Sequence, residues 1–135
     1  MIKLQKSTFL NEKETKNKLC EFIIQAETLS MGKECAKFET SFSKKQNRKY
    51  STFVNSGSSA NLILIQALLN LGRVNRGDFV AVSSLTWSTN IMPLIQLGLE
   101  PVLVDCSPKT VNVMSQQLLE RIHQIDLQAL FITNA

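Results

Sequence analysis

The first 50 residues carry hydrophobic positions at helical spacing. Leu19, Phe22, Ile23 and Ala26 follow one another at intervals of three and four residues, which places them on one face of a helix. This pattern predicts a helix over residues 11–29. Polar and charged residues fill the intervening positions, so we expect the opposite face to meet solvent.

A second, shorter helix is predicted after a break in the pattern at Gly32. The residues on its apolar side are Cys35, Phe38 and Phe42. The polar run over residues 43–49 ends it. Ahead of the first helix, Asn11 and Glu14 stand three residues apart, which resembles a capping box.

After residue 50 the pattern changes to short apolar runs, rich in β-branched and aromatic residues, that alternate with helical patterns. The apolar runs predict strands over residues 52–54, 79–82, 102–104 and 130–133. The helical patterns lie between them, over residues 59–71, 89–97 and 115–125. Strands and helices that alternate in this way form βαβ units with parallel strands.

The predicted fold class is therefore α/β, with N-terminal helices followed by βαβ units of a mostly parallel sheet. We divide the chain into an N-terminal helical segment over residues 1–50 and an α/β part over residues 51–135. No internal repeat and no low-complexity segment interrupts either part.

The composition is that of a soluble protein with a core. Of 135 residues, 44% are hydrophobic and 19% charged, and no apolar run approaches the ~18 residues that cross a bilayer. The first residues lack the apolar stretch of a signal peptide, so we expect a cytoplasmic protein without a membrane partner. Three scattered cysteines without a Cys-x-x-Cys pair predict free thiols rather than a zinc site.

The net charge of +4 is unevenly distributed. The excess of lysine and arginine lies within residues 1–50, where lysines alternate with glutamates, as on a solvated helix face. A nucleic-acid groove combines basic residues with interleaved aromatics for base stacking. Here Phe22, Phe38 and Phe42 have core-like spacing instead, so we expect no nucleic-acid partner.

Small polar residues follow the predicted strands, and ligands of open α/β sheets bind beyond the carboxyl ends of strands. The first such cluster is Asn-Ser-Gly-Ser-Ser at residues 55–59. Gly57 permits a tight turn and a close approach to a ligand, while Ser58 and Ser59 begin a helix whose free N–H groups suit a phosphate. The pattern fits equally well a simple turn in which Ser58 caps the helix.

Trp87, the single tryptophan, follows the second predicted strand. Its flat side chain is suited to stacking on a planar ligand. From the pattern alone, a tryptophan that belongs to the core or to a lid is the stronger interpretation.

The remaining candidates carry no chemistry in our interpretation. His123 lies beside an apolar stripe and is expected on the surface, and Asp105 is expected to stabilise the turn that follows it. Cys106 has no histidine nearby in the sequence, which argues against a nucleophile. We therefore assign no catalytic residue and no metal ligand.

Several segments in order resemble the N-terminal part of DegT/DnrJ/StrS-type sugar aminotransferases, which are fold-type I enzymes dependent on pyridoxal 5′-phosphate (PLP). These segments are VNSGSSANLILIQALLNLG, RGDFVAVSSLTWSTNIMPLIQLGLEPVLVD, KTVNV and, upstream, LSMGKECAKFETSFSKK. The resemblance extends from about residue 10 to the last residue. It is the combination of segments that is specific.

The resemblance implies a cofactor, a reaction and a partner. In the family the Ser-Gly-Thr/Ser segment binds the PLP phosphate, which corresponds to Gly57, Ser58 and Ser59, and an aromatic side chain stacks on the pyridine ring, which corresponds to Trp87. The reaction transfers an amino group from an amino acid, usually glutamate, to a nucleotide-linked keto-sugar. The family also implies a homodimer with active sites at the subunit interface.

The resemblance implies equally that part of the chemistry is missing. Transamination needs a lysine that holds PLP as a Schiff base and an acid that pairs with the pyridinium nitrogen, and in the family both come later in the chain. Lys109, in a turn, is no plausible substitute, and the other lysines lie within residues 3–49. We therefore expect an incomplete fold-type I large domain, an N-terminal fragment that is inactive alone, with the strand over residues 52–54 unpaired.

Three alternatives accompany this interpretation. A PLP-dependent nucleotide-sugar dehydratase, which uses histidine in place of the lysine, resembles the same segments. A non-catalytic α/β module that binds a phosphate or a partner is a second alternative. A generic dinucleotide-binding domain fits poorly, because the turn at residues 55–59 lacks the several glycines of that fingerprint.

Overall fold

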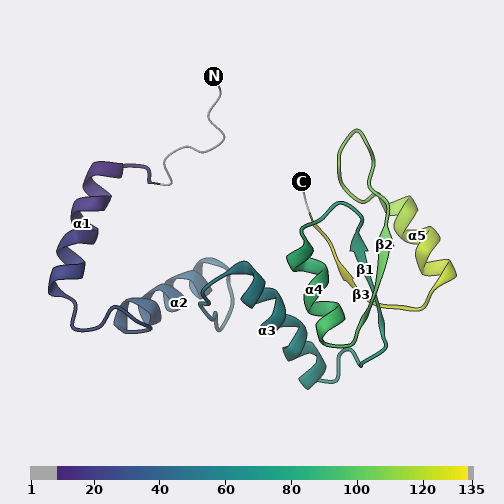
Figure 1. Ribbon diagram of the computed structural model, residues 1–135, viewed down its shortest axis with the longest axis horizontal. Coiled ribbons are helices and arrows are strands. Elements are labelled where there is room, and N and C mark those ends of the chain that lie inside the picture. Colours follow the sequence, from purple (N-terminus) through teal and green to yellow (C-terminus); the bar gives the residue numbers. More distant parts are fainter. Residues whose placement is uncertain (1–8, 134–135) are drawn as a thin grey trace. The chain divides into compact units, whose positions relative to one another are not determined.

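A computed structural model describes residues 9–133 and separates the chain into two units, residues 1–53 and 54–135. Among the described residues, the first unit contains two helices and the second contains three helices and a sheet; Figure 1 shows their order along the chain.

The helices of the first unit are α1 (Glu12–Gln25) and α2 (Lys33–Lys45), which confirms both predicted N-terminal helices. Asn11 occupies the N-cap position of α1, but its side chain makes no capping hydrogen bond. The capping-box prediction is therefore wrong in this detail. The alternating charges form ion pairs one helical turn apart, between Lys16 and Glu12 and between Lys18 and Glu14, as expected for a solvated face.

Residues 51–54 do not form a strand, contrary to the sequence prediction. This segment is extended and bonds to α2 instead: the Ser51 hydroxyl donates to the Glu39 carbonyl oxygen at 2.6 Å, and the Phe53 N–H donates to the Glu39 carboxylate at 2.8 Å. The Phe53 ring packs edge-on against Phe38 with centroids 5.1 Å apart. A strand requires hydrogen bonds to a neighbouring strand, whereas the bonds of Ser51 and Phe53 go to α2.

The second unit consists of alternating helices and strands. In chain order they are α3 (Gly57–Asn70), β1 (Phe79–Ser83), α4 (Ser88–Gln96), β2 (Glu100–Val104), α5 (Ser115–Gln124) and β3 (Leu127–Phe131). The sheet has the order β2-β1-β3, and β1 pairs in parallel with both neighbours. The predicted βαβ units and parallel sheet are confirmed.

The core of this unit lies between β1 and the helices α3 and α4. Its buried members are Ile65, Val74, Val80, Val82, Leu94 and Leu99. Residues 80–83 are all buried, so both faces of the central strand are covered. Strands covered on both faces are typical of parallel sheets. Burial of each valine, leucine or isoleucine of this core stabilises the fold by about 1.5–3 kcal/mol.

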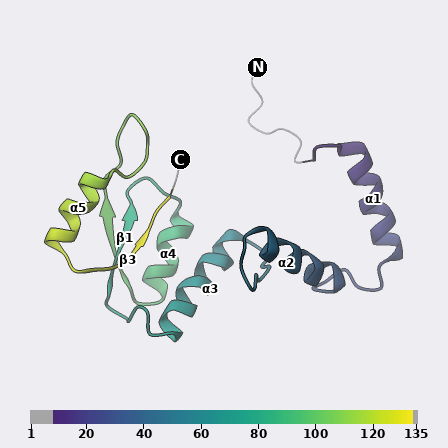
Figure 2. The same cartoon turned by 180° about the vertical axis from the view of Figure 1, so that it is seen from behind.

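The two crossover helices α4 and α5 lie on opposite sides of the sheet (Figures 1 and 2). α4 connects β1 to β2, and α5 returns from β2 past β1 to β3. The loops that leave the neighbouring strands β1 and β2 therefore run to opposite faces. In open α/β sheets this arrangement opens a crevice at the carboxyl edge, where ligands bind.

Gly98 ends α4 and permits the chain to enter β2. Its φ of 81° lies in the left-handed region, and a Cβ there would stand 3.4 Å from the side chain of Arg76. The N–H groups of Gly98 and Leu99 bond back to the carbonyl oxygens of Ile95 and Leu94, as in a glycine-ended helix. No helix among residues 9–133 has the length and apolar content needed to cross a membrane.

Candidate functional site

The first turn of α3 presents unpaired hydrogen-bond donors. Ser56 is the N-cap residue, and its hydroxyl oxygen accepts the N–H of Ser59 at 3.1 Å. The capping residue is therefore Ser56, not Ser58 as the alternative interpretation of the sequence had it. The N–H groups of Gly57 and Ser58 and the Ser58 hydroxyl have no hydrogen-bond partner among residues 9–133.

Ser59 has a different place in this turn. Its N–H is occupied by the cap, and its hydroxyl oxygen accepts the Ser56 hydroxyl proton at 3.1 Å. One hydroxyl proton of Ser59 remains for another acceptor. The positive end of the α3 dipole lies at the same turn and favours an anion.

Gly57 has helical backbone conformation as the first residue of α3, so the fold does not need glycine here for a tight turn. A Cβ at this position would meet no protein atom within 4 Å. The space over Gly57 is thus open to solvent. The backbone at Gly57 is therefore accessible to a ligand.

Trp87 stands at the N-cap position of α4 with 75% of its surface exposed. This exposure contradicts the interpretation of Trp87 as a core residue. The Trp87 carbonyl oxygen accepts the N–H of Asn90 at 2.9 Å, which fixes the backbone of the residue while the ring stays free. An exposed indole after the central strand is available for stacking on a planar ligand.

A network of side-chain hydrogen bonds joins α3 to the turn that carries Trp87. The Asn61 amide donates to the Asn90 side-chain oxygen at 2.7 Å. The Asn90 amide in turn donates to the hydroxyls of Thr86 and Thr133, at 2.8 and 3.1 Å. These two hydroxyls lie 2.5 Å from each other.

Thr133 also connects the network to the central strand. Its N–H donates to the hydroxyl of Ser83 at 3.0 Å, and Ser83 is fully buried at the end of β1. A buried hydroxyl with a partner stabilises its surroundings, whereas an unpaired one destabilises them. The segment after β3 is thereby fixed to the carboxyl end of β1.

Pro93 explains one further bond of Asn61. Proline lacks the N–H that would donate to the Thr89 carbonyl oxygen four residues earlier in α4. That carbonyl oxygen accepts the Asn61 amide at 3.2 Å instead. Pro93 is tolerated inside α4 because the side chain of Asn61 donates a hydrogen bond to the Thr89 carbonyl oxygen in place of the missing N–H.

The structure thus places Gly57, Ser58 and Ser59 together in the first turn of α3 and Trp87 at the start of α4. These two helices pack against each other (Figure 1). Asn61 and Asn90 were missed by the sequence analysis. Both lie in the polar first turns of their helices, directly before an apolar run, so the sequence offers no signal that sets them apart. Their bonding across 29 positions is visible only in the fold.

The other polar candidates lie apart from this network. Asp105 borders a cavity of about 200 Å³ with Gln117 and Arg121, Cys106 forms an isolated backbone bridge with Val113, and His123 is exposed, as predicted. The three cysteines are free thiols. Among the described residues no group of His, Cys, Asp or Glu side chains is arranged to hold a metal ion.

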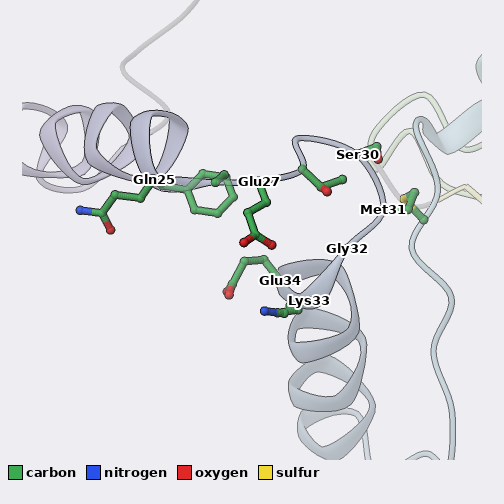
Figure 3. A pocket seen from close by; sticks show the side chains of 10 residues that line it. Gln25, Glu27, Ser30, Met31, Gly32, Lys33 and Glu34 are labelled. Carbon is green, nitrogen blue, oxygen red and sulfur yellow. The ribbon is translucent and has the colours of Figure 1, made fainter.

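A larger cavity, of about 540 Å³, lies in the first unit at the connection between α1 and α2 (Figure 3). Its polar lining includes Glu27, Lys33 and Glu34, and Phe22 contributes an apolar wall. Lys33 and Glu34 come from the first turn of α2. All three charged side chains are exposed, so solvent screens their charges, and the cavity lacks the buried polar groups of a shaped site.

The second unit is an open α/β unit with a parallel sheet, a helix N-terminus with unpaired donors among the described residues, and an exposed tryptophan after the central strand. Residues 10–132 match the DegT/DnrJ/EryC1/StrS aminotransferase family. The chain belongs to this family, as the resemblance in the sequence indicated.

Individual relatives carry more than one activity. The chain is 35% identical to GDP-4-keto-6-deoxy-D-mannose 3-dehydratase of Escherichia coli O55:H7 over 107 residues, which are 78% of this chain and 28% of the relative. It is 34% identical to GDP-perosamine synthase of Caulobacter vibrioides over 89 residues, 66% of this chain and 23% of the relative. The chain thus spans less than a third of the length of these relatives.

A solved structure shares the fold. The E. coli GDP-4-keto-6-deoxy-D-mannose 3-dehydratase with bound hydrated PLP superposes with a TM-score of 0.77 and 34% identity, covering 87% of this chain and 30% of that enzyme. The predicted fold class is confirmed: the elements described above match part of a PLP-dependent sugar enzyme.

Proposed function

We propose that this chain binds the phosphate and ring of PLP and is the N-terminal part of an aminotransferase that acts on nucleotide-linked keto-sugars. The observation that carries the proposal is the first turn of α3, where the N–H groups of Gly57 and Ser58 and the Ser58 hydroxyl lack partners among the described residues. Converging donors at a helix N-terminus suit a phosphate. Ser59 adds its hydroxyl proton.

Trp87 supplies the second half of the proposed cofactor site. Its exposed indole stacks on the pyridine ring of PLP, and the bonds from α3 to α4 keep the two parts of the site in one rigid arrangement. The 3-dehydratase structure with bound PLP aligns with 87% of this chain, which supports the choice of cofactor.

PLP, when bound, supplies an electron sink for bond breaking next to the amino group. The residues proposed here bind and orient the cofactor but do not hold or move a proton at the substrate carbon. Lys109 is exposed in the loop after β2, and we propose no covalent role for it. We therefore expect this chain alone to transfer no amino group.

The substrate class and the partners follow from the relatives. Both relatives named above act on, or are named for, GDP-linked sugars, and we propose a nucleotide-linked keto-sugar and an amino-acid donor for the complete enzyme, in amino-sugar or polysaccharide biosynthesis. We also propose a cytoplasmic location and a homodimer. Sedimentation velocity of the complete enzyme tests the homodimer, and a strictly monomeric species contradicts it.

A dehydratase is the second candidate, favoured by the 35% identity to the 3-dehydratase. The two activities differ in the residue that faces the cofactor carbon, lysine in the transaminase and histidine in the dehydratase. The coding sequence downstream of Ala135 distinguishes them. A lysine at the position that faces the cofactor carbon supports the aminotransferase. A histidine at the same position overturns the aminotransferase proposal in favour of the dehydratase.

Cofactor binding is tested on the 135-residue chain by titration with PLP, followed by the fluorescence of its single tryptophan. We expect saturable quenching, and about tenfold weaker binding for the double variant S58A/S59A, the effect of losing one or two hydrogen bonds to a charged group. Pyridoxal without its phosphate should bind more weakly than PLP. Equal binding of the wild type and the double variant contradicts the proposed phosphate site.

Two further outcomes separate the alternatives. Binding of inorganic phosphate without any preference for PLP favours a non-catalytic phosphate-binding module. Covalent trapping of PLP by borohydride on Lys109, absent in the variant K109A, contradicts the proposal that the chain lacks the cofactor-linking residue.

A further inference from the structure

Asn90 makes more cross-element contacts than any other side chain of the network around the proposed cofactor site. Its oxygen accepts the Asn61 amide at 2.7 Å, and its amide donates to Thr86 and Thr133 at 2.8 and 3.1 Å. These partners lie 29, 4 and 43 positions away in the sequence. One half-buried amide thus joins α3, the turn after β1 and the segment after β3.

Trp87 depends on such bonds for its position. With 75% of its surface exposed, the indole has little packing to hold it. The residue before it, Thr86, is bonded through its hydroxyl to Asn90, and the Trp87 carbonyl oxygen accepts the Asn90 N–H at 2.9 Å. Asn90 therefore holds the Trp87 turn from both sides, through its side chain and through its backbone.

The same side chain is tied to the phosphate-binding turn. Asn61, which donates to the Asn90 oxygen, stands one helical turn after Gly57 and Ser58 in α3. A helix is stiff over one turn because its backbone bonds are internal. The position of Asn90 relative to Asn61 therefore sets the position of Trp87 relative to the donors of Gly57 and Ser58.

We propose that Asn90 is a positioning residue that fixes the backbone at Trp87, so that the indole can stack on the ring of a cofactor whose phosphate lies at the α3 N-terminus. Its side-chain hydrogen bonds go to Asn61, Thr86 and Thr133, and it acts through Thr86 and Asn61. This inference rests on the proposed PLP site. A bound ring is held best when both of its contacts are pre-organised, since no ordering then accompanies binding.

The substitution N90L tests the proposal because leucine has a similar volume and forms no hydrogen bond. The remaining partners stay satisfied: Asn61 keeps the Thr89 carbonyl oxygen, and the hydroxyls of Thr86 and Thr133 keep each other. T86V is a second variant, which removes the link next to Trp87 and leaves Asn90 bonded to Asn61. The matched control is Q66A, because Gln66 donates a side-chain amide to Asn70 within α3 alone.

Three measurements on the 135-residue chain follow. For N90L and T86V we expect a PLP affinity about tenfold lower than that of the wild type, which corresponds to the loss of one hydrogen bond. We also expect incomplete quenching of Trp87 fluorescence at saturating PLP. The inhibition constant of inorganic phosphate against PLP should stay as in the wild type, because the α3 donors are untouched. The double variant N90L/T86V should bind no more weakly than N90L, since both act through one path.

Hydrogen exchange without any ligand provides a readout independent of PLP. We expect faster exchange in residues 84–90 and at Thr133 in N90L and T86V, and no change in Q66A. A wild-type chain that binds no PLP contradicts the proposed function. In that case the hydrogen-exchange data alone show whether Asn90 holds the turn that carries Trp87. Full quenching of Trp87 by PLP in N90L and T86V, together with unchanged hydrogen exchange, overturns the proposal. An equal loss of phosphate and PLP binding in these variants also overturns it, because such a loss indicates general unfolding. T86V decides the question if N90L does not fold.

Discussion

At the residue scale, four consecutive residues of the α3 start divide two tasks between them. Ser56 caps the helix by accepting the Ser59 N–H, while Gly57 and Ser58 present donors that nothing else in the described chain uses. The sequence predicted the cluster, but its alternative interpretation, in which Ser58 caps the helix, names the wrong serine. Ser56 and Ser58 are two positions apart, so an error of two residues in the predicted start of the helix confuses the capping serine with the serine proposed to bind. Hydrophobic periodicity does not define a helix start to within two residues.

This division predicts opposite effects of two similar substitutions. S56A should lower the free energy of unfolding by about 1 kcal/mol, the usual cost of losing an N-cap side chain, whereas S58A should leave the stability unchanged because its hydroxyl has no partner. Urea denaturation measures both. For PLP affinity the order should reverse, with S58A weakening binding more than S56A. A stability loss in S58A equal to that of S56A would contradict the assignment of the cap.

At the element scale, the sequence predicted all five helices and the strands at residues 79–82, 102–104 and 130–133, each within a few residues of the observed bounds. Helices are predictable because their hydrogen bonds are local. The strand expected at residues 52–54 is absent because strand pairing is non-local, and in this chain the Phe53 N–H bonds to Glu39 instead. For the same reason the pairing of Asn61 with Asn90 was not predictable.

The interface between α3 and α4 leads to a prediction about Asn61 and Pro93. N61A should lower the free energy of unfolding by about 1–3 kcal/mol, because the Thr89 carbonyl oxygen loses its partner where Pro93 has no N–H to offer. P93A restores that N–H within α4. N61A should therefore cost less in the P93A background than in the wild type, by about 1 kcal/mol.

Chemical denaturation of the wild type, the two single variants and the double variant measures this coupling. Q66A serves as a control, since its amide bonds only within α3 and should show no coupling to P93A. Strict additivity of N61A and P93A would mean that the Thr89 carbonyl oxygen has another partner.

At the scale of the whole molecule, the apolar surface of α3 exceeds what the described chain covers. Only Ile65 of this helix is buried, while Leu62, Ile63 and Leu64 are exposed. A helix that is apolar on all sides is normally buried on all sides. The sheet likewise has β2 and β3 at its edges, where unpaired backbone groups invite further pairing. Both features agree with a chain that spans less than a third of its relatives.

These surfaces predict that the 135-residue chain self-associates, and that α3 contributes to the association. I63K should shift the weight-average mass in sedimentation equilibrium toward the monomer, because it removes exposed apolar area and adds a charge. Q66K adds the same charge on the same helix at a polar position and should change the mass much less. Equal shifts in the two variants would assign the effect to net charge alone. An unchanged mass in I63K, with native circular dichroism, would assign the association to the sheet edges, where Leu103 and Leu130 are the exposed apolar residues to substitute next.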